Sequence, residues 1–210
     1  MFVKMCGFTR VEDLEKIIGL NVSAAGFVFY RKSKRNIEPE KAKELCSVIK
    51  GSGISATGVF VDDDADEIKR IAEYAGLDML QVYGRETALS LQGFLPVISC
   101  FRVKEEHSAA DLPEPCGDGH VLFDTYDAKS MGGTGNSFNR NILREYRFRE
   151  RMIVAGGVNS SNIYSLIKEI KPFGVDISSG IETAPGIKSP DRIHEILEKI
   201  AEAENDSIAR

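Results

Sequence analysis

The chain has 210 residues, 42% of them hydrophobic and 28% charged, and its 27 Lys and Arg against 32 Asp and Glu give a net charge of −5. This composition excludes an intrinsically disordered chain, and the acidic balance argues against binding nucleic acid through phosphate neutralisation. No apolar run approaches the roughly 18 residues of a membrane-spanning helix, and residues 1–30 lack the pattern of a signal peptide. We therefore expect one cytoplasmic domain over residues 1–210 that binds neither membrane nor nucleic acid.

Short β-branched and aromatic runs alternate with amphipathic segments along the chain. The runs predict strands over residues 2–6, 25–29, 57–61, 79–82, 97–101, 121–124, 152–155 and 174–177. Helical periodicity appears between most of these runs and near the C-terminus. Thr9 and Glu12 have the spacing of a capping box for the first helix, and Pro39 suits the first turn of the second. Residues 105–119 are expected to form a loop with at most one turn of helix, and residues 139–151 predict a helix only weakly.

Eight strands that alternate with helices indicate βαβ units and a parallel sheet. Such a sheet either stays open and doubly wound or closes into a (β/α)8 TIM barrel. Polar and glycine residues follow at least six of the strands, whereas an open sheet would concentrate them at one switch point. Barrel enzymes build their sites from that rim, so we favour an α/β single-domain (β/α)8 barrel.

Three glycine-rich segments follow the last three expected strands. They are Gly132-Gly133-Thr134-Gly135, Ala155-Gly156-Gly157 and Ser178-Ser179-Gly180. Each one alone is an ordinary turn sequence. Together they favour a phosphate site built from backbone N–H groups, which needs no basic surface.

Other residues at strand ends carry alternative interpretations. Cys6 is a buried apolar residue or, beside a helix N-terminus, a thiolate base or nucleophile. Asp124 caps a turn or serves as a proton donor with a raised pKa. Asp176, inside the eighth strand, is expected to hydrogen-bond neighbouring loop amides. Arg35 belongs to a basic loop that is either a solvated surface loop or the partner of a substrate carboxylate. The four cysteines form no C-x-x-C pair, so no metal or redox motif is indicated.

These residues together resemble a known family over essentially the whole chain. The matching pieces are Lys4-Met5-Cys6-Gly7 with Thr9, Ala25-Gly26-Phe27-Val28-Phe29 leading to Ser33 and Arg35, Gly58-Val59-Phe60-Val61, Gln81-Val82 with Gly84, Phe123-Asp124, Gly132-Gly133-Thr134-Gly135 with Phe138, Ala155-Gly156-Gly157-Val158, and Gly174-Val175-Asp176-Ile177-Ser178-Ser179-Gly180-Ile181-Glu182. In this order they are similar to the phosphoribosylanthranilate isomerases of tryptophan biosynthesis.

The resemblance implies an isomerase that carries out an Amadori rearrangement of N-(5'-phosphoribosyl)anthranilate without cofactor or metal. It implies that Asp124 is the general acid, that Cys6 is the general base and that Arg35 binds the anthranilate carboxylate. The substrate-binding residues it implies are Arg35, Gln81, Gly133, Gly135, Gly156, Gly157, Asp176, Ser179 and Gly180. It implies a small phosphorylated substrate and a monomer or homodimer.

Four positions depart from the family pattern. Lys34 stands where Pro is usual and bears on where Arg35 lies, and Tyr83 stands where His is usual. The other two are Asn139-Arg140 in place of Asp-Trp after Phe138, and Ser189 in place of Asp after Lys188. We expect none of them to touch Cys6 or Asp124.

Related barrels and a non-catalytic barrel compete with this interpretation. The histidine-pathway isomerase has aspartates at both catalytic strand ends, whereas Cys6 stands at the first here. A pentose-phosphate epimerase needs metal-binding His and Asp, and the histidines here are scattered. Indole-glycerol-phosphate synthase needs a catalytic lysine and glutamate near the strand ends, and Lys4, inside the first strand, gives that alternative only weak support. A silent phosphate-binding barrel has no need of both Cys6 and Asp124.

Overall fold

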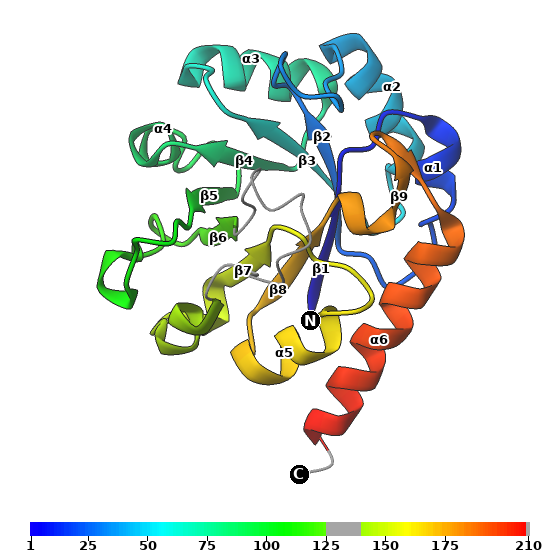
Figure 1. Cartoon of the computed structure of the whole chain (residues 1–210). Helices are drawn as coiled ribbons and strands as arrows, with labels where there is room; N and C mark the ends of the chain where they lie inside the picture. The colour runs from blue at the N-terminus through cyan, green and yellow to red at the C-terminus, as the bar shows by residue number, and fades with distance from the viewer. Residues whose placement is uncertain (125–139, 209–210) are drawn as a thin grey trace.

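A closed barrel of eight parallel strands forms the centre of the molecule, as the sequence predicts (Figure 1). The computed structural model describes residues 1–124 and 140–208. The strands are β1 (Phe2–Cys6), β2 (Ala24–Val28), β3 (Ser55–Phe60), β4 (Met79–Tyr83), β5 (Val97–Arg102), β6 (His120–Asp124), β7 (Met152–Ala155) and β8 (Gly174–Ile177). Each pairs with its neighbour in chain order, and β1 pairs with β8 from Phe2↔Gly174 to Met5↔Ile177, which closes the sheet.

Helices surround the barrel and bury their apolar faces against the outside of the strands (Figure 1). They are α1 (Val11–Glu15), α2 (Pro39–Ile49), α3 (Ala65–Ala75), α4 (Arg85–Ser90), α5 (Ile163–Ile170) and α6 (Pro190–Ile208). Short 3₁₀ turns occupy Ala109–Asp111, Arg140–Glu145, Arg149–Arg151 and Ser179–Ile181, and a small hairpin joins β9 (Glu182–Ala184) to β10 (Ile187–Lys188). Among the described residues of the weakly patterned stretch 139–151, the backbone therefore forms 3₁₀ turns instead of an α-helix.

The first helix begins differently from the capping box that the sequence predicts. Its N-cap is Arg10, and no side chain caps it. The Thr9 hydroxyl donates instead to the main-chain oxygen of Gly186, 2.8 Å away, in the β9–β10 hairpin. The Thr9 hydroxyl, which the local spacing assigns to the helix N-terminus, therefore bonds to a segment far away in the chain. Pro39, by contrast, begins α2 as predicted.

Alternation along the strands separates the residues that face the helices from those inside the barrel. On β1, Val3 and Met5 belong to the core shared with the helices. Cys6 instead packs against Val28 and Val59, at the carboxyl ends of the first three strands. The polar residues that follow these strands therefore meet at one end of the barrel.

Candidate active site

A cavity of about 350 Å³ opens at the carboxyl ends of the strands. The residues around it include Cys6, Arg35, Gln81, Tyr83, Arg102, Asp124, Gly156, Gly157, Asp176, Ser178 and Ser179. Eight of the sequence-predicted site residues thus lie around one hollow. Gly180 lines an adjoining pocket together with Gly157 and Ser179. Gly133 and Gly135 lie outside the described residues.

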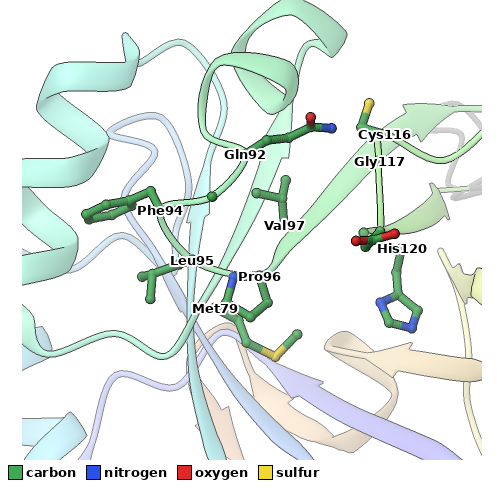
Figure 2. A pocket seen from close by; sticks show the side chains of 12 residues that line it. Met79, Gln92, Phe94, Leu95, Pro96, Val97, Cys116, Gly117 and His120 are labelled. Atoms are coloured by element: carbon green, nitrogen blue, oxygen red, sulfur yellow. The ribbon is translucent and has the colours of Figure 1, made fainter.

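A larger cavity, of about 670 Å³, lies at the other end of the barrel (Figure 2). It is lined by Met79, Val97 and His120, which are the first residues of β4, β5 and β6. The last residues of the same three strands line the smaller cavity. Because barrel enzymes carry their chemistry at the carboxyl ends of the strands, the smaller cavity is the candidate active site.

Cys6 ends β1 and presents a buried thiol to the cavity. Burial raises the pKa of this thiol, and the neighbouring charge of Lys4 opposes that rise. Lys4, two residues earlier on the same strand, is fully buried and donates to Asp176 Oδ1 at 2.9 Å. The sequence-based expectation that Asp176 bonds to loop amides is therefore wrong. Its carboxylate accepts a hydrogen bond from the buried Lys4 ammonium inside the barrel instead.

Asp124 ends β6, and Tyr83 lies beside it at the end of β4. The Tyr83 hydroxyl donates to Asp124 Oδ2 at 3.3 Å. Burial, together with Cys100 and Asp124, raises the pKa of Tyr83 far above its usual value, so the phenol stays protonated. The Arg102 guanidinium lies 4.8 Å from the centre of the Tyr83 ring. The expectation that no departure from the family pattern touches the proposed acid is therefore wrong for Tyr83.

Arg35 reaches the cavity from the loop after β2 and is held by Glu182. Its Nε donates to Glu182 Oε1 at 2.9 Å and Oε2 at 3.1 Å, and a second nitrogen donates to Oε2 at 2.5 Å. Lys188 donates to the same carboxylate at 2.7 Å and to the main-chain oxygen of Cys6. Arg35 therefore lies at the cavity although Lys34 replaces the usual Pro.

Sequence reasoning assigned no role to Glu182, Lys188, Tyr83 or Arg102. Glu182 and Lys188 stand within or beside the family-pattern segments, and this position is the one signal that the sequence offers for them. Their partners lie far away in the chain, so no local pattern identifies them.

The turn after β7 brings backbone to the edge of the cavity. Gly156 and Gly157 have φ values of +83° and +63°, a conformation that side-chain-bearing residues rarely adopt. Asn159 and Asn162 donate to the Gly157 oxygen at 3.0 and 2.8 Å, which fixes this turn. At Gly180 an added Cβ would collide with the main-chain oxygen of Val158. The turns after β7 and β8 therefore pack backbone against backbone, which leaves no room for a side chain at position 180.

The fold and this cavity define a (β/α)8-barrel enzyme whose candidate site is lined by residues from different strands. Comparison with known proteins then identifies the family. The family model described as N-(5'-phosphoribosyl)anthranilate (PRA) isomerase matches residues 3–199. An N-(5'-phosphoribosyl)anthranilate isomerase from Geotalea uraniireducens is 37% identical over 198 residues, which cover 94% of this chain and 97% of that protein.

Solved structures agree with the sequence comparison. The phosphoribosyl anthranilate isomerase of Thermotoga maritima has a TM-score of 0.82 and 30% identity, covering 96% of this chain and 99% of that one. Another isomerase structure, in complex with reduced 1-(o-carboxyphenylamino)-1-deoxyribulose 5-phosphate, has a TM-score of 0.77, 30% identity and the same coverage. The chain belongs to the N-(5'-phosphoribosyl)anthranilate isomerase family. It is an isomerase of tryptophan biosynthesis.

Proposed function

We propose that Asp124 and Cys6 are the general acid and general base of this isomerase. Asp124 gives a proton to the ring oxygen of N-(5'-phosphoribosyl)anthranilate, the C1'–O bond breaks, and a protonated Schiff base forms. The Cys6 thiolate removes the C2' proton, and the resulting enolamine tautomerises to the aminoketose. The observation that carries this proposal is that Cys6 and Asp124, from β1 and β6, line one cavity with the glycine turns of β7 and β8.

The same cavity offers groups for the two anionic ends of the substrate. Backbone amides of Gly156, Gly157, Ser179 and Gly180, with Gly133 and Gly135 of the segment outside the described residues, would hold the phosphate. Glu182 fixes the Nε edge of Arg35, and the Arg35 guanidinium would hold the anthranilate carboxylate.

Gln81 and Asp176 complete the proposed substrate-binding set. Gln81 is 2% exposed, lines the cavity, and its Oε1 has no partner within the described part of the chain. A buried acceptor of this kind costs stability until a ligand donates to it, so a substrate hydroxyl or amine is its expected partner. Asp176 lines the cavity while it holds Lys4.

The fluorescence of freshly generated phosphoribosylanthranilate, lost on turnover, measures the activity. Cys6→Ala and Asp124→Asn should each lower kcat by at least about 100-fold, since a positioned acid or base contributes about 10²–10⁴-fold. Cys46→Ala on α2 and Asp66→Asn on α3 are matched controls outside the cavity and should leave turnover unchanged. Undiminished turnover in Cys6→Ala or Asp124→Asn refutes the role of that residue.

Location and assembly belong to the proposal too. We place the chain in the cytoplasm, as one domain over residues 1–210 that binds a small phosphorylated substrate and no nucleic acid. Among the described helices, none combines the length and apolarity needed to cross a membrane. A similar structure, 28% identical, consists of monomers generated from the dimeric isomerase of Thermotoga maritima. Sedimentation velocity distinguishes monomer from homodimer for this chain.

A further inference from the structure

The proposed base needs a counter-charge. A thiol accepts a proton only after it has ionised, and Cys6 is 7% exposed. Burial of this kind favours the neutral thiol. A group close to the sulfur must therefore favour the thiolate if Cys6 is to work near neutral pH.

Lys4 is placed to do this. Residues two apart on a strand point to the same face, so Lys4 and Cys6 both project into the barrel. Gly26 on β2 shows how close they are: a Cβ added there would lie 2.7 Å from Cys6 Sγ and 3.0 Å from Lys4 Nζ. Both atoms flank one point, so they are less than about 6 Å apart, a range in which an opposite charge favours ionisation.

The charge on Lys4 is secured by Asp176. Lys4 is 0% exposed, and burial alone would lower its pKa. The carboxylate of Asp176 at 2.9 Å, together with Cys6, instead raises the pKa of Lys4 above its usual value. Lys4 therefore keeps its ammonium charge inside the barrel.

Other ionisable groups also face Cys6, and their effects on the thiol differ in sign. The ammonium of Lys188 also favours the Cys6 thiolate, less than Lys4 does, while it pairs with Glu182 at 2.7 Å and donates to the main-chain oxygen of Cys6. Among the described residues, the remaining groups that act on Cys6 are Asp176 on β8, Cys100 on β5 and Tyr83 on β4. Of these, Asp176 opposes ionisation of the thiol, while burial keeps Cys100 and Tyr83 in their neutral forms.

We propose that Lys4 is a positioning residue for the base: its ammonium, held by Asp176, stabilises the Cys6 thiolate, and Gly26 leaves the space in which the two groups meet. This inference rests on the proposed role of Cys6 in the reaction. Because Cys6 is mostly a thiol in the resting enzyme, losing the Lys4 charge reduces the thiolate fraction and slows proton removal.

The test measures ionisation of Cys6 directly. Iodoacetamide alkylation of Cys6, followed by peptide mass spectrometry across pH, gives the midpoint of thiol ionisation. In Lys4→Gln, which keeps a donor for Asp176, the midpoint should rise by about one to two pH units, the effect of a unit charge at 6 Å. We expect kcat to fall by only about three- to tenfold, with KM unchanged. The thiolate fraction becomes smaller, but the thiolate that remains is more basic and partly offsets this loss.

Two further variants separate charge from structure. Lys4→Arg keeps the charge and should restore the midpoint to within half a unit. Lys16→Gln is the matched control, since Lys16 also pairs with a buried aspartate, Asp13, at 3.0 Å but outside the cavity. It should leave the Cys6 midpoint in place. An unmoved midpoint in folded Lys4→Gln overturns the inference.

The unmodified protein supplies a measurement that needs no folded variant. Burial, with Asp78 nearby, raises the pKa of Cys46 to about 12, and no ammonium of the described residues lowers it. The Cys6 midpoint should therefore lie below that of Cys46 although Cys6 lies inside the barrel. A Cys6 midpoint at or above that of Cys46 overturns the inference. If Cys6→Ala remains active while the Lys4→Gln midpoint rises, the proposed base fails and the Lys4 pairing stands.

Discussion

Replacing Glu182 by Gln tests the ionic cluster that connects Arg35 to the first strand. The Glu182 side chain is 3% exposed and lies between Arg35 and Lys188, whose own side chain is 0% exposed. The neutral amide would leave the Lys188 ammonium buried without its counter-ion. Removing one partner of such a pair costs about 3–5 kcal/mol, a large share of the roughly 5–15 kcal/mol by which proteins are stable.

The pH dependence of this loss has a definite sign. Burial alone would raise the pKa of Glu182, but the hydrogen bonds from Arg35 and the charge of Lys188 outweigh it and lower that pKa. A carboxylate with a lowered pKa stabilises the fold above its unfolded pKa of about 4.3, and the effect disappears as pH falls through the folded value. The difference between the parent and Glu182→Gln should therefore be largest near neutral pH and shrink below about pH 4.

Urea unfolding followed by far-ultraviolet circular dichroism measures the loss, because the chain contains no Trp. Glu44→Gln is the control: Glu44 pairs with Lys41 at 2.8 Å, but both side chains are exposed. That variant should lose less than about 1 kcal/mol. Adding Lys188→Met to Glu182→Gln should recover part of the loss, because the unpaired ammonium is gone. A Glu182→Gln protein as stable as Glu44→Gln would refute the reasoning.

Three further substitutions address the cavity. Tyr83→Phe removes the donor to Asp124 and should raise the pKa of Asp124, so the limb of the kcat–pH profile that Asp124 sets moves up by about one unit. Gln81→Met removes a buried acceptor that has no partner among the described residues, so KM should rise while the free energy of unfolding stays the same or increases. Gly26→Ala puts a methyl group 2.7 Å from Cys6 Sγ, so kcat should fall at least about tenfold and stability by about 1–3 kcal/mol.

Controls and contrary results for these three differ. Tyr146→Phe deletes a buried hydroxyl that donates to Pro113, outside the cavity, and should leave the pH profile unmoved. If both limbs shift in Tyr83→Phe, or neither does, its contact with Asp124 has no catalytic effect. If Gln81→Met lowers the free energy of unfolding and leaves KM unchanged, Gln81 has a structural role and does not bind the substrate. Unchanged kcat in Gly26→Ala would mean that the thiol has more room than the structure shows.

The barrel itself could be predicted from the sequence because its determinants are local. Alternation of short apolar runs with amphipathic segments specifies strands and helices, and each strand end fell within two residues of its predicted position. The position of Cys6 and Asp124 at strand ends followed from the same pattern. Since parallel strands end on one rim, a list of strand-end residues already predicts much of the lining of a cavity.

Which side chains touch within that cavity was decided only by the closed barrel. Lys4 meets Asp176 across 172 residues, Arg35 meets Glu182 across 147, and Tyr83 meets Asp124 across 41. Each contact depends on strand register, and the first two also depend on the closure of β1 against β8; neither leaves a local pattern. Hydrophobic periodicity reports which face is buried, whereas a buried charge is stable only beside its partner, and the tertiary structure alone supplies that partner.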